Sequence, residues 1–125
     1  QRRLRPGSHI LLLLDPRSVD ATAERSLARL RAHHDLAACL VADAIEWHAP
    51  APARYPIASE NARRSVLQLD DAVARSAWEE HFREQHAEAM GRLRRVGART
   101  RITLTHEDPV HALRELLGSG ANGAQ

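Results

Sequence analysis

The chain has 125 residues, of which 43% are hydrophobic, and it carries a formal charge of +2. This length and composition are typical of a single globular domain. No run of apolar residues is long enough to cross a membrane as a helix. We therefore expect one soluble, intracellular domain without a membrane span.

The charged residues are mixed in sign. All eighteen basic residues are arginines, and sixteen acidic residues are interleaved with them. Proteins that bind nucleic acids gather cations on one face and often add aromatic side chains, but only 3% of this chain is aromatic. We therefore expect no nucleic-acid partner.

Several common catalytic and cofactor motifs are missing. Without lysine the chain has no phosphate-binding P-loop, and it also lacks G-x-S-x-G, G-x-G-x-x-G and C-x-x-C motifs. The only cysteine, Cys39, lies in the apolar run "LAACLV", which is typical of a buried, unreactive thiol. We expect no cofactor.

The first predicted elements form a strand and a helix. Residues 1–8, "QRRLRPGS", read as a lead-in without periodicity. A strand follows at 9–15, and its apolar side chains do not alternate with polar ones, so we expect a central parallel strand covered on both faces. Asp20 is then suited to cap a helix over 21–33, whose apolar residues recur at helical spacing.

A second apolar strand is predicted at 35–43, so that strand, helix and strand make a right-handed parallel unit. The proline-rich stretch that follows, "EWHAPAPARYP", forbids a helix and is expected to leave the core. Residues 55–58 and 65–69 are expected to pair as a hairpin. Trp47 and Tyr55 either anchor this excursion or contact a partner, and both interpretations stay open.

The last part of the chain predicts a long helix, a strand and a shorter helix. Asp70 and Asp71 precede the long helix, which ends at Gly97. The alternating strand at 100–105 is expected near an edge of the sheet. Asp108 begins the last helix, which runs through Leu117, and the tail 118–125, "GSGANGAQ", is expected to be disordered.

Asp15 is the first candidate for a site, because it follows a buried strand and ligands bind at the carboxyl ends of parallel strands. It could instead cap the turn after the strand. The alternative to an interaction module is a small-ligand or metal-dependent enzyme with its site at the strand ends near Asp15, Asp43 and Thr105, and an exposed cluster of Asp15, Asp43 and His106 around one pocket would favour it. His81 and His86 lie about 140° apart around the long helix, so we expect them to be solvated or half-buried rather than metal ligands.

Residues 9–117 resemble the C-terminal half of proteins of the domain of unknown function 58 family. The members of this family are bacterial proteins that contain a von Willebrand factor A-like domain and are often encoded beside MoxR-type AAA ATPases. The resemblance rests on an apolar strand that ends in aspartate ("ILLLLD"), on "AHHDLAACLVADAIEW", on the hairpin-like insert, and on "DDAVARSAWEEHFREQHAEAMGRLRRVGARTRITLTHEDPVHALREL". It implies an α/β fold: a partial, doubly wound parallel sheet of about three strands, flanked by helices and carrying a β-hairpin insert.

The resemblance also implies a role. Von Willebrand A-like domains bind protein partners, commonly through a divalent ion held by a D-x-S-x-S loop. Here Pro16, Arg17 and Ser18 follow Asp15, and the arginine cation opposes a divalent ion, so Asp15 is a weak metal candidate that is favoured as a cap. We expect a noncatalytic interaction module of a larger bacterial protein, partnered with a MoxR-like AAA ATPase in the cytoplasm or at the cytoplasmic face of the membrane.

The pattern of the strands also predicts association. Right-handed crossovers place the first helix and the long helix on the same face of the sheet, and the last helix can cover only part of the other face. Since both predicted central strands are apolar throughout, we expect part of the sheet to be buried against another domain or, in isolation, in a homodimer.

Overall fold

The computed structural model describes residues 4–58 and 63–118. These residues form two compact units: one drawn from 4–43 and 85–118, and the other from 44–58 and 63–84. The elements in chain order are β1 (His9–Leu14), a short 3-10 helix η1 (Pro16–Ser18), α1 (Ala21–Arg31), β2 (Asp35–Ala42), α2 (Ala44–Trp47), β3 (Arg54–Ala58), β4 (Arg64–Gln68), α3 (Ala72–Val96), β5 (Arg99–Leu104) and α4 (Pro109–Gly118). The tail beyond 118 and the first residues of the predicted lead-in lie outside the described residues.

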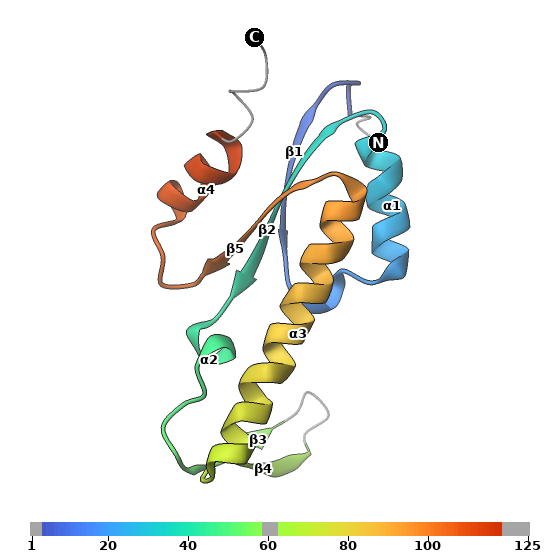
Figure 1. Cartoon of the computed structure of the whole chain (residues 1–125). Helices are drawn as coiled ribbons and strands as arrows, with labels where there is room; N and C mark the ends of the chain where they lie inside the picture. The colour runs from blue at the N-terminus through green and yellow to red at the C-terminus, as the bar shows by residue number, and fades with distance from the viewer. Residues whose placement is uncertain (1–3, 59–62, 119–125) are drawn as a thin grey trace. The chain divides into compact units, whose positions relative to one another are not determined.

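The first unit is built on a three-stranded sheet of order β1-β2-β5, as Figure 1 shows. Both pairs are parallel, with Leu12 opposite Ala38 and Leu40 opposite Ile102. The predicted α/β class, the parallel pairing and the sequential strand order are therefore confirmed.

One layer of helices covers one face of this sheet. Buried residues of β2, namely Leu36, Ala38 and Leu40, pack with Ala89 and Leu93 of α3. Partly buried leucines of α1 join the same cluster. In Figure 1, α1 and α3 lie on one side of the sheet and α4 lies on the other. The predicted same-face placement of the first and the long helix is confirmed, as right-handed crossovers require.

The burial of β1 corrects one expectation. β2 is the central strand and is buried along nearly its whole length, whereas β1 lies at an edge and alternates between half-buried and exposed side chains. Leu11 and Leu13 are exposed. The apolar run of β1 was expected to be covered on both faces, but α4 contacts β5 and β2, and its Leu116 packs on Ala37 and Cys39. The second face of β1 is therefore left open.

The predicted helix caps are present. The side chain of Asp20 accepts a hydrogen bond of 2.7 Å from the N–H of Ala23, which satisfies one of the free donors in the first turn of α1. Asp71 does the same for Ala74 in α3, at 2.7 Å, and Asp108 accepts from the first turn of α4. Acidic residues at these positions also interact favourably with the helix dipole.

Gly97 ends α3 as predicted, because its φ of 83° lies in the left-handed region that favours glycine. The N–H of Ala98 bonds back to the carbonyl of Leu93 at 3.1 Å, and the N–H of Gly97 to that of Arg94 at 2.9 Å. This is the hydrogen-bond pattern of a Schellman cap, and it turns the chain directly from α3 into β5.

The second unit contains the predicted hairpin. β3 and β4 are antiparallel, with Arg54 opposite Gln68 and Ala58 opposite Arg64, and they form a sheet of their own. The short helices α2 and η1 were not predicted, because three or four residues are too few to show a helical period. α2 includes Glu46 and Trp47, so the expectation that the stretch beginning there forbids a helix is wrong for these two residues, which precede the first proline, Pro50. No helix among the described residues has the length and apolarity needed to cross a bilayer.

Candidate interaction surface

Asp15 lies directly after β1 and is bound by its own loop. Its Oδ1 accepts hydrogen bonds from the backbone N–H of Arg17 at 2.8 Å and from the Arg17 Nε at 3.1 Å, and its Oδ2 accepts from Nη2 at 2.9 Å. The hydroxyl of Ser18 donates to the Asp15 carbonyl at 2.6 Å. The hydrogen bond from the Arg17 side chain, opposed by some desolvation, lowers the pKa of Asp15. Asp15 is therefore the cap of η1, the role that the sequence favours.

The other residues of the enzyme hypothesis, Asp43, Thr105 and His106, also follow strands of the sheet. A groove at the carboxyl edge of the sheet is lined by Thr105, whereas Asp15, Asp43 and His106 are not among its lining residues. The N–H of Thr105 is used in the backbone, bonding to the carbonyl of Ala42 at 2.9 Å. Within residues 4–58 and 63–118, no group of three or more acidic, histidine or cysteine side chains could hold a metal ion.

The two histidines of α3 differ from each other. His81 is exposed and its ring contacts Phe82 edge-on, with the centroids 5.5 Å apart, in line with the prediction. His86 is 1% exposed, so the prediction of a solvated or half-buried side chain is wrong for this residue. The signal was present in the sequence, since His86 lies four residues after Phe82 and three before Ala89 on the apolar face of the helix.

The most prominent surface feature of the first unit is the sheet face opposite α1 and α3. Leu13 is 65% exposed, and Leu11 and Val41 are each 40% exposed. Because Leu11 pairs with Ala37 and Leu13 with Cys39, these side chains and Val41 point to the same face of the sheet. We call the surface formed by Leu11, Leu13 and Val41 the uncovered face.

A groove of about 320 Å³ continues the uncovered face toward α4. Its sheet side is formed by Leu13, Cys39 and Val41, and its helix side by Ala112 and Leu113. The lining is mainly apolar, which is typical of a site that takes an apolar side chain or ligand.

The floor of the groove contains one polar pair. The buried thiol of Cys39 donates to the Oγ1 of Thr103 at 3.2 Å. Thr103 is 8% exposed, so its hydroxyl gains a partner inside the sheet face. The predicted burial of Cys39 is confirmed, and the pair explains how a threonine is accommodated beside the apolar lining.

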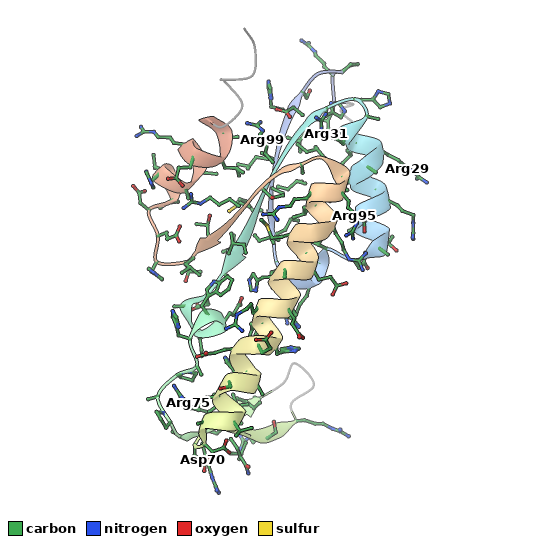
Figure 2. All side chains as sticks on the ribbon, viewed as in Figure 1. Arg29, Arg31, Asp70, Arg75, Arg95 and Arg99 are labelled. Atoms are coloured by element: carbon green, nitrogen blue, oxygen red, sulfur yellow. The ribbon has the colours of Figure 1, made fainter. Side chains whose placement is uncertain are left out.

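Arginines hold α4 onto β5. The Nη2 of Arg99 lies 2.7 Å from a carboxylate oxygen of Asp35, and its Nη1 donates to the carbonyl of Leu117 at 2.9 Å (Figure 2). Arg101 pairs with Glu107 at 3.0 Å and also with Glu115 of α4. These side chains were not assigned any role from the sequence, because contacts between side chains of different elements leave no periodic pattern.

The second unit contains Trp47 and Tyr55, which the sequence predicts either to anchor the proline-rich excursion or to contact a partner. Trp47 is half-buried at the end of α2. The hydroxyl of Tyr55 donates to the carbonyl of Ala51 at 2.6 Å, so the tyrosine ties the proline-rich excursion to itself. The hydrogen bond from the Nε1 of Trp78 to the carbonyl of Ile45, at 2.8 Å, was not foreseen.

α3 supplies further anchors for the excursion. The backbone N–H of Ala49 donates to the Oε1 of Glu79 at 2.9 Å, and the guanidinium of Arg75 donates to the carbonyls of Ala49 and Pro50 (Figure 2). Carbonyls and an N–H that have no regular secondary-structure partner are thereby satisfied by two charged side chains.

No protein-family model, curated protein or solved structure matches this chain.

Proposed function

We propose that the chain is a noncatalytic protein-interaction module and that its docking surface is the uncovered face with the adjoining groove. The observation that supports this most strongly is the 65% exposure of Leu13 beside Leu11 and Val41. Parallel sheets are normally covered on both faces, and contiguous apolar surface commonly marks a site of association.

Burial of the uncovered face by a partner is energetically favourable. Fully burying an exposed leucine or valine side chain contributes about 1.5–3 kcal/mol, and Leu11 and Val41 are 40% exposed and Leu13 65%, so covering each contributes about half of that. A domain is stable by only about 5–15 kcal/mol. Covering the three side chains with a partner therefore contributes about 2–4 kcal/mol in sum, which is appreciable on this scale.

The geometry at Asp15 bears on how a partner is recognised. In metal-dependent von Willebrand A-like domains, an aspartate and two serines hold a divalent ion that bridges to the partner. In this chain Arg17 occupies both carboxylate oxygens of Asp15 and places a cation beside them. We propose that recognition here uses apolar contact, without a metal or other cofactor.

The identity of the partner follows from the resemblance. In this proposal the chain is part of the C-terminal half of a von Willebrand A-like domain in a larger bacterial protein, which works with a MoxR-like AAA ATPase in the cytoplasm or at the cytoplasmic face of the membrane. The parallel order β1-β2-β5 with helices on both sides is compatible with such a domain.

Binding to the MoxR-type ATPase of the same bacterium tests this proposal. Biolayer interferometry with the immobilised chain should detect the ATPase, and Leu13→Asp should weaken binding at least tenfold, because it places a charge in an apolar contact. Val73→Asp is the matched control, since Val73 is 80% exposed and lies in the first turn of α3, where an acidic residue is tolerated. Equal binding by both variants contradicts the proposed surface, and absence of binding by the unaltered chain contradicts the proposed partner.

A further inference from the structure

The free edge of β1 has none of the features that normally protect a sheet edge. From Ile10 to Leu14 the strand contains no charged residue, proline or glycine. No described strand pairs with its outer side. Natural edge strands are usually blunted by charges, prolines or bulges, because the unpaired backbone groups are otherwise a template for another strand.

The opposite edge of the same sheet is protected. β5 carries Arg99 and Arg101, and both arginines take part in ion pairs. Hydrogen bonds from Arg99 to carbonyls at the end of α4 also hold that helix against β5. The contrast between the two edges indicates that the sheet is built to grow on the β1 side only.

We infer that the free edge of β1 pairs, antiparallel, with β1 of a second copy of this chain about a two-fold axis perpendicular to the sheet. This inference rests on the proposed function, because the pairing joins the uncovered faces of two copies into one docking surface. Pairing doubles the three-stranded sheet and places the two uncovered faces side by side on the same side of it. The result is one wide apolar surface.

The sequence of β1 is self-complementary in this arrangement. When the two-fold axis passes beside Leu12, Leu11 of one copy lies opposite Leu13 of the other, so that both exposed leucines meet an apolar neighbour. The same register brings His9 opposite Asp15 of the second copy, and each of these side chains keeps its partner within its own chain, Asp35 for His9 and Arg17 for Asp15. A shift of one residue would set exposed side chains opposite core-facing ones.

Paired cysteine variants test this register. In a Cys39→Ala background, which removes the native thiol, Leu11→Cys and Leu13→Cys are prepared separately and then mixed in equal amounts under mild oxidation. Directly opposed residues of antiparallel strands have Cα atoms about 4.5–5.5 Å apart, within the range of a disulfide, whereas the diagonal pairs formed by one variant alone are too distant. We expect several-fold more disulfide-linked dimer in the mixture than in either variant alone.

The outcomes separate this inference from the proposed function. Val73→Cys, at an exposed site outside the strand, gives the level of random collision. Efficient cross-linking of Leu13→Cys with itself, or cross-linking of the mixture at the Val73→Cys level, overturns the β1 pairing. If the ATPase binding of the unaltered chain is nevertheless lost in Leu13→Asp, the proposed function survives that result. The converse result is also possible: the predicted cross-links form, but Leu13→Asp binds the ATPase as tightly as the unaltered chain. That result supports the strand pairing and contradicts the proposed partner surface.

Discussion

Arg17 binds both carboxylate oxygens of Asp15, with its Nε 3.1 Å from Oδ1 and its Nη2 2.9 Å from Oδ2. This arrangement turns an aspartate at the carboxyl end of a parallel strand into a closed cap. The position is where ligands bind in many α/β proteins. Here the ligand of the carboxylate is Arg17, the neighbouring arginine of the same loop.

The first prediction follows from this ion pair. We expect isothermal titration with Mg²⁺, Mn²⁺ or Ca²⁺ to show no micromolar binding, because hard cations require several clustered oxygen ligands and Arg17 holds the oxygens of Asp15. Asp15→Ala is the companion variant. Micromolar affinity in the unaltered chain that disappears in Asp15→Ala would show that the loop is a metal site after all.

Two glycines of the long helix region give a matched pair of stability variants. Gly97→Ala should lower the free energy of unfolding by about 1–2 kcal/mol, because a Cβ is strained at a φ of 83°. Gly91→Ala should raise it by about 0.5–1 kcal/mol, because Gly91 lies inside α3 and the nearest atom to an added Cβ is the Arg95 Nη1 at 3.6 Å. Urea denaturation measures both. A loss of stability in Gly91→Ala equal to that in Gly97→Ala would contradict the assigned cap.

The third prediction concerns the core cluster under α1 and α3. Leu93 is fully buried against the sheet, so Leu93→Ala should cost about 2–5 kcal/mol through lost burial and the cavity left behind. Val73→Ala, which removes an exposed side chain of the same helix, should change stability by less than about 0.5 kcal/mol. Similar denaturation midpoints for the two variants would mean that Leu93 is not in the core.

The fourth prediction concerns pH. Glu24 accepts hydrogen bonds from Arg95 and Arg92, each as short as 2.9 Å, and the bond from Arg95 is the largest cause of its lowered pKa. A carboxyl with a pKa lowered by folding stabilises the protein above its unfolded value, and this contribution is lost as the pH falls through the folded value. The lowered pKa values of Asp15 and Asp35 act in the same direction. Stability should therefore fall below about pH 4–5.

Glu24→Gln isolates one part of this effect. The variant should be less stable than the unaltered chain at pH 7, and the difference should shrink as the pH is lowered, because protonated Glu24 has also lost its charge. Chemical denaturation at a series of pH values gives both curves. A difference that stays constant or grows toward low pH is the opposite of what the ion pairs require.

The sequence predicted much of the fold because local signals agreed with the tertiary structure. The capping role of Asp20 and the stop at Gly97 depend on a few neighbouring residues, and both were found as expected. The parallel order of the strands followed from two apolar runs joined by a helix. The short elements η1 and α2 were missed because three or four residues carry no period.

The exposure of β1 and the groove could not be predicted in the same way. The apolar run of β1 indicates that both its faces prefer burial, but the place where α4 lies depends on contacts of Arg99 and Arg101 with residues distant in the sequence. The groove likewise combines Leu13, Cys39 and Leu113 from three separate elements. Such assemblies are fixed by tertiary packing and leave no local pattern to read.

Light scattering over a micromolar concentration series tests the central claim that the uncovered face is an association surface. The mass of the unaltered chain should rise from 13.9 kDa toward twice that value as the concentration increases. Leu13→Asp and the milder Leu13→Thr, which keeps a good strand former, should remain near 13.9 kDa while retaining native circular dichroism. Val73→Asp should associate like the unaltered chain. A monomeric mass for the unaltered chain at every concentration, or unchanged association in both Leu13 variants, would contradict the account.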